Sequence, residues 1–408
     1  MVTVYPMEFD SMRICRFPFL ARVLWGFGLL PLMSLPILLS SCQNETSPAP
    51  QSAEGRSRIR LGYLGLTCEA AMFVAQEKGF FQEEGVDVEF VKTDWDGLRD
   101  GLGLGRFDAN YTLIMYLLKP IEQGLDVKIT GGVHSGCLRV QVGPESQVQS
   151  VADLKGKKIG IPTMGSPPFL FASRALSAQG LDPKKDVSWV VIAPDVMGLA
   201  LENGQVDAVA DSEPLGSILM ATNNVRTLAD QAVDAPYSEE YCCATVVSGK
   251  FLARDREGAA KVTRALLKGA MWVDKNPTAA ASLSVEKKYV ASSTEINAQA
   301  IGKLGYRPGV TRCRESVLSA AKEMKVAQLL NLSTDPEELA RQAWVDLDGV
   351  TDEWLDGLQV ETIAGGGRPI PLDPESLARL FASDVNFRFM CCDLCCDPKM
   401  NDDALCRW

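Results

Sequence analysis

The stretch IRLGYLGLTCEAAMFVAQEKGFFQEEGVDVEFVK, residues 59–92, joins three segments with different hydrophobic spacing. IRLGYLG (59–65) is typical of a strand that runs into a glycine loop, and EAAMFVAQEKGFF (69–81) has the spacing of a helix. VDVEFVK (86–92) alternates between apolar and polar residues, as a second strand does. Strands that alternate with helices predict βαβ units and a mostly parallel sheet.

The same succession recurs further along the chain. KIGIPTMGS (158–166) repeats the strand and its glycine loop, and FLFASRALSAQG (169–180) repeats the helix. DVSWV (186–190) corresponds to DVEFV in the first set, and GQVDA (204–208) corresponds to GRFDA, both at the same offset. We therefore predict two lobes built on one plan. Ligands bind beyond the carboxyl ends of strands in such sheets, so two lobes can close on a ligand between them.

Four segments resemble the solute-binding proteins of ABC importers: CEAAMFVAQEKGFFQEEGVDVEF (68–90), GRFDAN (105–110), SVADLKGKKIGIP (150–162) and NGQVDAVADSEP (203–214). The resemblance is to the group that serves nitrate, sulfonates, taurine and thiamine-pyrimidine precursors. It implies an α/β, two-lobe periplasmic-binding-protein (type II) fold. Each lobe would be a mostly parallel sheet with flanking helices, and crossing strands would form the hinge.

The resemblance also implies a function. Such a protein captures a small solute and delivers it to an ABC permease and its ATPase, without acting as an enzyme. Two alternatives stay open: an enzyme or biosynthetic protein of the same fold that uses cysteines or a metal, and a surface sensor. The expected segments are a signal peptide (1–41), a flexible tether (42–57), the first lobe (58–137), the second lobe (138–245), a return to the first lobe with C-terminal helices (246–364) and a Cys-rich tail (365–408).

The N-terminal residues have the pattern of an export signal. Arg13, Arg16 and Arg22 precede the apolar stretch VLWGFGLLPLMSLPILL (23–39). Leu39-Ser40-Ser41-Cys42 then resembles the lipobox of bacterial lipoproteins. We expect lipidation of Cys42 and an extracytoplasmic protein held on the cell membrane; a plain signal peptide or an uncleaved anchor is the alternative.

Composition excludes several classes of protein. The 408 residues carry a formal net charge of −11, which argues against nucleic-acid binding because that needs clustered cations. His134 is the one histidine, and the sequence contains no GxSxG elbow, HExxH motif or P-loop. We therefore assign no catalytic residue, no cofactor and no metal site.

Residues that follow the predicted strands are the candidates for ligand contact. They are Thr67, Cys68, Trp95 and Thr112 in the first lobe, His134 and Cys137 at the outward crossing, Ser166, Asp211 and Glu213 in the second lobe, and Cys243 at the return crossing. Each has a structural alternative: Trp95 as lobe core, the hydroxyls as helix N-caps, His134 as a hydrogen-bonded structural residue, and the two acids as a solvated lip. The acids favour a neutral or amine-bearing heterocycle over a bare oxyanion.

Four cysteines, Cys68, Cys137, Cys242 and Cys243, fall on loops and crossings beside His134. Three interpretations stay open: disulfides, as expected outside the cytoplasm; free thiols that pack as small apolar side chains; and a site for a soft metal or a thiol-reactive ligand. The tail sequence CCDLCC (391–396) predicts disulfides or a tail that binds metals loosely.

Overall fold

The computed structural model describes residues 58–369 and residue 376. The expected signal peptide, Cys42, the tether and most of the Cys-rich tail lie outside the described residues. Within the described part, no helix combines the length and apolar character needed to cross a membrane.

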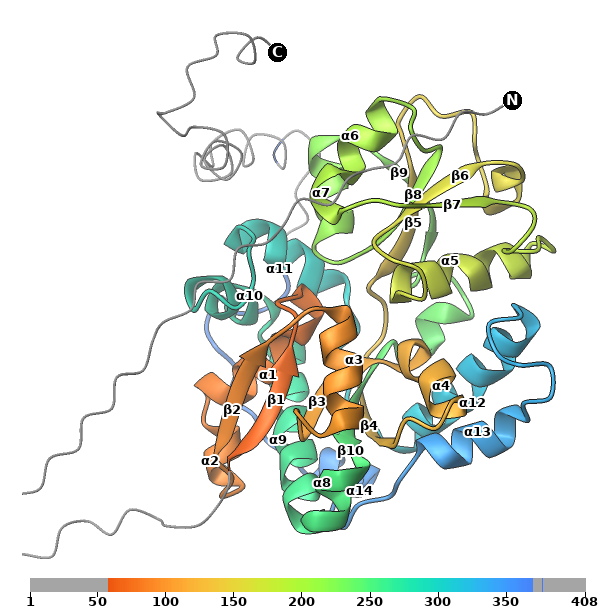
Figure 1. Ribbon diagram of the computed structural model, residues 1–408. Coiled ribbons are helices and arrows are strands. Elements are labelled where there is room, and N and C mark those ends of the chain that lie inside the picture. Colours follow the sequence, from red (N-terminus) through yellow and green to blue (C-terminus); the bar gives the residue numbers. More distant parts are fainter. Residues whose placement is uncertain (1–57, 370–375, 377–408) are drawn as a thin grey trace, which may run out of the picture. The chain divides into compact units, whose positions relative to one another are not determined.

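The first sheet has five strands in the order β2-β1-β3-β10-β4 (Figure 1). Their bounds are β1 Ile59–Tyr63, β2 Val88–Lys92, β3 Ala109–Leu113, β4 Val127–His134 and β10 Cys243–Ser248. β1 pairs in parallel with β2 and β3, and Leu61 lies opposite Phe90 and Ala109. β10 runs antiparallel to β3 and β4, so the sheet is mixed.

The second sheet repeats this plan in the order β7-β6-β8-β5-β9. Its bounds are β5 Leu138–Val142, β6 Lys158–Ile161, β7 Ser188–Val191, β8 Ala208–Ser212 and β9 Arg226–Asp230. β6 is parallel to β7 and β8, and β5 is antiparallel to β8 and β9. The two sheets with their flanking helices are called the first and second lobes below. The predicted two-lobe α/β fold is confirmed, with mixed sheets; the residue boundaries of the predicted domains stay a prediction.

Each sheet contains one exchanged strand. β5 directly follows the strands of the first sheet along the chain but lies in the second sheet, and β10 follows the strands of the second sheet but lies in the first. β5 follows the outward crossing from β4 and occupies the place in the second sheet that β10 occupies in the first. The outward crossing is Ser135-Gly136-Cys137, in which Gly136 and Cys137 both have positive φ, 75° and 146°. A Cβ on Gly136 would lie 2.6 Å from the Cβ of Ala232, so the crossing needs glycine there.

Fourteen α-helices are present in the described residues: α1 Ala70–Glu77, α2 Phe80–Glu83, α3 Trp95–Leu104, α4 Ile114–Glu122, α5 Pro167–Ala178, α6 Met197–Glu202, α7 Leu215–Thr222, α8 Gly249–Arg254, α9 Arg256–Lys275, α10 Pro277–Glu286, α11 Thr294–Lys303, α12 Thr311–Val326, α13 Pro336–Ala343 and α14 Asp352–Asp356. In Figure 1, α3 lies in front of the first sheet and α9 behind it.

The helix predicted over residues 69–81 is interrupted. α1 ends at Glu77, and Gly79 adopts a left-handed conformation with φ 78° before α2 begins at Phe80. A left-handed glycine ends a helix because it turns the chain away from the helical path. The continuous helix was therefore wrong at Gly79, although the apolar spacing on both sides of it was right.

The long helix α9 packs against α1. Its apolar positions, among them Val262, Leu266 and Val273, are fully buried. Asp255 caps its start by accepting a hydrogen bond from the Gly258 amide. Gly269 lets the two helices approach closely, because a Cβ there would lie 2.2 Å from the Ala71 carbonyl oxygen.

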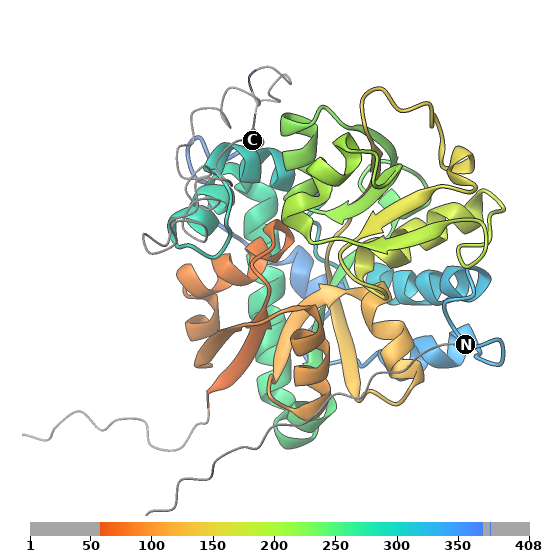
Figure 2. The same ribbon diagram turned by 45° about the horizontal axis from the view of Figure 1, so that its top comes forward.

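The C-terminal helices contact both lobes. α9, α12 and α13 pack on β4 of the first sheet, whereas α11 contacts α7 and α12 contacts α5 of the second lobe. The blue segment α12 lies beside α4 in both views (Figures 1 and 2). These helices therefore connect the two lobes in addition to the crossings.

Candidate functional site

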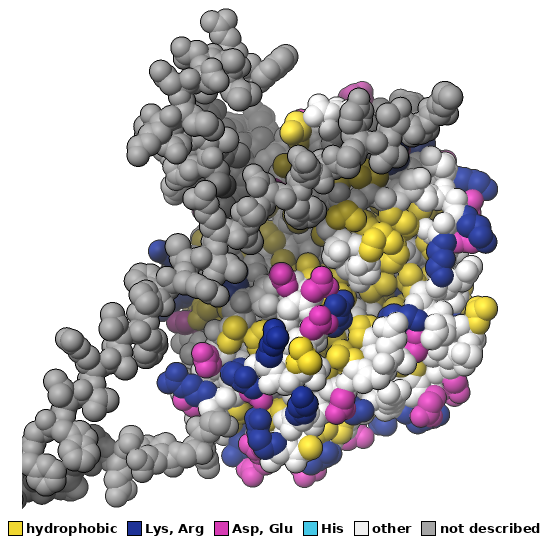
Figure 3. Space-filling model, in the orientation of Figure 1, with side chains coloured by type: hydrophobic (Ala, Val, Ile, Leu, Met, Phe, Trp, Pro, Cys, Tyr) yellow, Lys and Arg dark blue, Asp and Glu magenta, His cyan; other side chains and the backbone are white. Residues whose placement is uncertain are grey.

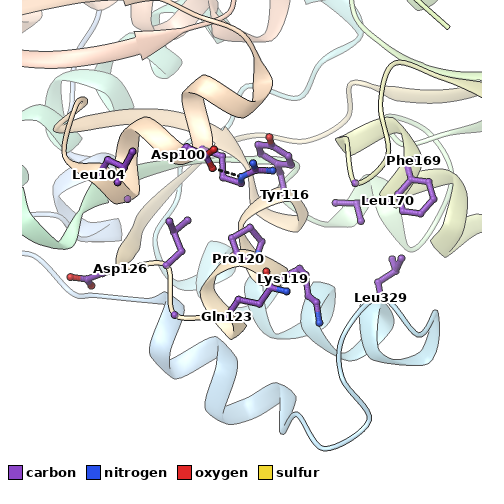
Figure 4. Close-up of a pocket in the computed structure, with 15 residues that line it drawn as sticks. Asp100, Leu104, Tyr116, Lys119, Pro120, Gln123, Asp126, Phe169, Leu170 and Leu329 are labelled. Carbon is purple, nitrogen blue, oxygen red and sulfur yellow. Dashed lines mark hydrogen bonds and ion pairs between the residues drawn. The ribbon is translucent and has the colours of Figure 1, made fainter. Parts of the chain in front are cut away.

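A groove of about 900 Å³ is lined by residues from both lobes (Figure 4). Arg99, Tyr116 and Lys119 line it from α3 and α4 of the first lobe, and Phe169 and Leu170 line it from α5 of the second. Figure 3 shows hydrophobic side chains gathered over the middle of the same face. The groove has the size of a small-molecule site.

The two cations of the groove are bonded to carboxylates. Arg99 Nε lies 2.8 Å from a carboxylate oxygen of Asp100, as the dashed line in Figure 4 marks, and Lys119 pairs with Glu122. The Lys119 ammonium also donates to Asn331 Oδ1 at 3.0 Å. A bare anion would have to compete with these carboxylates for either cation.

Trp95 adjoins the first-lobe wall of the groove, because it contacts Tyr116. It is half-buried at the start of α3, where the Asp94 carboxylate caps the helix by accepting from Gly97 N–H at 2.7 Å. Its ring packs edge-on against Tyr116, with centroids 5.4 Å apart, and the Tyr116 hydroxyl donates to the Trp95 carbonyl at 2.8 Å. Burial raises the pKa of Tyr116 to about 12, so this hydroxyl keeps its proton at neutral pH.

The predicted hydroxyl residues are buried and do not act as N-caps through their side chains. Thr67 lies in a short 3-10 helix and donates to Asn297 Oδ1 at 2.7 Å, whereas Thr112 lies inside β3. Ser166 occupies the N-cap position of α5 and directly follows Gly165, which lines the groove. Its hydroxyl has no hydrogen-bond partner among the described residues.

Asp211 and Glu213 lie at the end of β8 and are fully buried instead of forming an exposed lip. Glu213 accepts from the guanidinium of Arg139 and from the Ser217 hydroxyl, and Arg139 Nε donates to Asp230 at 2.7 Å. The Asp211 carboxylate accepts no hydrogen bond from the described residues. Burial raises its pKa well above the ordinary value, against the opposing charge of Arg139.

Four of the cysteines meet where the chain crosses between the lobes. The Sγ atoms of Cys68, Cys137 and Cys243 all lie within 4.8 Å of one another. Cys242 Sγ lies 3.2 Å from that of Cys137 and 4.0 Å from that of Cys243. All four are buried free thiols, and we call them the thiol cluster.

Backbone hydrogen bonds hold the segments of the thiol cluster together. Cys242 N–H donates to the His134 carbonyl at 2.9 Å, and Glu213 N–H donates to the Cys137 carbonyl at 3.0 Å. The Tyr306 hydroxyl donates to the Cys68 carbonyl at 2.9 Å. The ends of strands in both sheets therefore converge on the cluster.

The thiols of the cluster differ in acidity. Hydrogen bonding to Cys137 raises the pKa of Cys68 to about 11, and burial raises the pKa of Cys137 to about 11. Burial opposes ionisation of Cys242, but the thiols of Cys137 and Cys243 donate to it and lower its pKa to about 6.

His134 is fully buried beside the cluster. Its Nδ1 lies 3.3 Å from the Ser135 carbonyl oxygen, which can only accept, so the ring proton belongs on Nδ1. Nε2 makes no hydrogen bond within the described residues, and the ring lies beside Cys68. The Tyr306 ring lies 4.9 Å away.

Sequence reasoning missed several residues of this region. Arg139 neutralises the buried acids, Tyr116 forms a wall of the groove, and Tyr306 comes from the C-terminal third. Asn110 is fully buried in β3, and its amide has no partner among the described residues. A polar residue inside a buried strand was the available signal for Asn110; no motif pointed to Tyr306.

Comparison with known proteins decides the family. The model of the NMT1-like family matches residues 52–285. The chain belongs to the NMT1-like family. The resemblance stated from the sequence is thereby confirmed.

Relatives of this NMT1-like chain include a nitrate/nitrite binding protein and a putative thiamine biosynthesis protein. It is 23% identical over 279 residues to a nitrate/nitrite binding protein of Nostoc sp., a match that covers 62% of this chain and 63% of that one, less than two thirds of its length. It is 28% identical over 255 residues to a putative thiamine biosynthesis protein of Haemophilus influenzae, covering 61% and 78% of the two chains.

Solved structures of the same fold include the alkanesulfonate-binding protein SsuA from Xanthomonas axonopodis pv. citri bound to MOPS. The TM-score is 0.59 at 18% sequence identity, and the match covers 72% of this chain and 100% of that one. This likeness supports the fold of the NMT1-like chain as that of a two-lobe solute-binding protein.

Proposed function

We propose that this chain is the solute-binding component of an ABC importer. In this proposal a small solute binds in the groove between α3–α4 and α5, and the loaded protein delivers it to a permease powered by an ATPase. The observation that carries the proposal is the groove itself, because residues of both lobes form its walls. Family membership and the name of the nitrate/nitrite-binding relative support it.

We infer that the lobes are in their closed arrangement. Three helix pairs, α4 with α5, α12 with α5 and α11 with α7, make contacts between the lobes or between the second lobe and the C-terminal helices. On opening, we propose that Ser166 and Asp211 of the second lobe become accessible. Both carry buried polar atoms without a hydrogen-bond partner in the described residues, as expected of groups that await a polar ligand.

The proposed solute is a neutral or amine-bearing small molecule. The importer would belong to the group of ABC importers that serves nitrate, sulfonates, taurine and thiamine precursors. The groove cations Arg99 and Lys119 are each paired with a carboxylate, and buried Arg139 is paired with two. Because these pairs must be broken before an anion gains a full counter-charge, bare oxyanions are the weaker candidates.

We also propose that the mature protein begins at lipidated Cys42 and works outside the cytoplasm, on the membrane. The LSSC sequence after an apolar run supports this. The proposal includes no reaction on the solute. The thiamine-biosynthesis name of one relative and the thiol cluster favour the alternative, a biosynthetic protein of the same fold.

A binding screen tests the proposed function. The chain from residue 42 is heated with nitrate, sulfonates, taurine and pyrimidines, and a bound solute raises the melting temperature by mass action. The hit should also lower the radius of gyration in solution scattering and be recovered unchanged by mass spectrometry. Phe169→Ala in the groove should weaken binding at least about tenfold, or 1.4 kcal/mol, whereas Leu332→Ala, at an exposed position, should not. A hit recovered as a different compound favours the biosynthetic alternative, and equal affinity in both variants refutes the groove.

A further inference from the structure

The thiol cluster brings together side chains that lie far apart in the sequence. Cys68 lies at the start of the first helical segment, Cys137 in the outward crossing and Cys243 in the returning strand β10. His134 ends β4 beside them and pairs with Cys243 in the sheet. We propose that Cys68, Cys137, Cys243 and His134 bind one thiophilic cation with the coordination chemistry of Zn²⁺. The proposal is independent of solute capture in the groove.

The spacing of the three sulfurs fits a common metal. Zinc bonds to thiolate at about 2.3 Å, so two sulfurs of one tetrahedral site lie about 3.8 Å apart. Cys68, Cys137 and Cys243 have all their Sγ atoms within 4.8 Å of one another. Side-chain rotation that shortens the longest sulfur–sulfur separation by roughly 1 Å would bring all three sulfurs to the separation found on one zinc ion.

His134 has the chemistry of a fourth ligand, but its ring nitrogens are not among the atoms that all lie within 4.8 Å of one another, so the ring must move towards the sulfurs on binding. Its Nε2 carries a free lone pair, while Nδ1 faces the Ser135 carbonyl at 3.3 Å. Histidines that bind metals almost always donate their other ring N–H to such an acceptor, which fixes the ring and its tautomer. The ring is fully buried, so solvent does not compete for Nε2.

Cys242 is better placed as a hydrogen-bond partner than as a ligand. Its sulfur lies 3.2 Å from that of Cys137, within hydrogen-bond distance, and it is not one of the three sulfurs that all lie within 4.8 Å of one another. Charge favours the same assignment. Three thiolates, an imidazole and Zn²⁺ leave a net charge of about −1, whereas four thiolates leave about −2, which costs more to bury.

The site is closed, as structural zinc sites are. Each thiol of the cluster is at most 3% exposed. Binding replaces three S–H bonds with three metal–sulfur bonds and releases those protons to solvent, with no change in oxidation state. The cation would tie the start of α1 to the outward and the return crossing.

The test uses the full-length chain, reduced, with serine at the seven cysteines outside the described residues: Cys15, Cys42, Cys391, Cys392, Cys395, Cys396 and Cys406. Titration with Co²⁺ should give one equivalent of tetrahedral, thiolate-bound metal by visible absorption, and Zn²⁺ should displace it. X-ray absorption of the zinc form should find three sulfurs at about 2.3 Å and one nitrogen at about 2.0 Å. This measurement needs no variant of the cluster.

Variants assign the ligands. Cys243→Ser and His134→Ala should each weaken metal binding by more than about 100-fold, the upper end of what loss of an outer partner costs. Cys242→Ser should weaken it by about 100-fold or less. Cys313→Ser is the matched control, since Cys313 is a fully buried free thiol in α12 outside the cluster, and it should leave affinity unchanged.

Three results would overturn the proposal. They are a chain that takes up no tetrahedral Co²⁺, a metal that coordinates only oxygen and nitrogen, and a Cys313→Ser variant that loses as much affinity as Cys243→Ser. Loss of binding in Cys242→Ser with none in His134→Ala would overturn the assignment of the fourth ligand.

Discussion

Arg174 of α5 donates to the Glu323 carboxylate of α12 through Nε at 2.8 Å, and so joins the second lobe to a C-terminal helix that packs on the first. The Arg174 side chain is 1% exposed and also pairs with Glu240, at the start of the return crossing. A buried guanidinium between two carboxylates connects three segments that would separate if the lobes opened.

Glu323→Gln should loosen this connection. The amide keeps the shape but removes a charge from a buried Arg174, so we expect unfolding in urea to become easier by about 1–3 kcal/mol. Solution scattering of the ligand-free variant should show a larger radius of gyration. Glu338→Gln removes the charge of an exposed pair with Arg341 and should change neither quantity. Equal behaviour of the two variants would mean that Arg174 does not hold the lobes together.

Gly269→Ala should destabilise the first lobe. The new Cβ would lie 2.2 Å from the Ala71 carbonyl oxygen, so α1 and α9 must move apart, at a cost of about 1–3 kcal/mol. Gly143→Ala, where a Cβ meets nothing within 4 Å, should stay within about 0.5 kcal/mol of the parent chain. Chemical denaturation measures both, and a well-tolerated Gly269→Ala would show that the helices have room to separate.

Asp211→Asn should change how stability depends on pH. Burial raises the pKa of Asp211, so the folded chain holds the proton more tightly than the unfolded chain does. Stability from this group is therefore present below the ordinary pKa and is lost as pH rises towards the folded pKa. The variant cannot titrate there, so its stability relative to the parent chain should increase as the pH rises above the ordinary range of an aspartate towards the raised pKa of Asp211.

The control for that experiment is Asp195→Asn, at an exposed position. It should shift the melting temperature little and by the same amount at each pH. A constant difference between Asp211→Asn and the parent chain would show that Asp211 is ionised throughout, stabilised by Arg139.

Cys42→Ala should abolish lipidation. The proposal rests on the LSSC sequence, in which the cysteine is the acceptor of the acyl chains. Cells fed radiolabelled fatty acid should label the parent chain and not the variant, which should stay uncleaved or leave the membrane fraction. Label on the Cys42→Ala protein would show that acylation, if any, uses another residue.

The sequence predicted the architecture well because the two lobes repeat one pattern. The strands β1 and β2 and the helix α5 all follow from local spacing. The returning strand β10 makes the first sheet mixed, and that depends on pairing across more than 100 residues, which local spacing does not encode.

The site was harder to predict than the fold. The sequence placed Cys68, Cys137 and Cys243 on converging segments, and the structure brings their thiols together. Burial was not foreseen: Asp211 and Glu213 were expected near solvent but lie under Arg139 and α7. Whether a strand end is open or covered depends on how the lobes meet, and that is a property of side chains from distant segments.

The exchange of β5 and β10 between the two sheets also sets the order in which the sheets can be completed during synthesis. β4 pairs with β10 and with no other strand of its sheet, so it has no neighbour until residue 248 has left the ribosome. By then the whole second sheet has been synthesised. The lobe that starts first on the ribosome is therefore the one that finishes last, and a chain truncated at the first crossing would leave β4 as an orphan segment instead of a small stable domain.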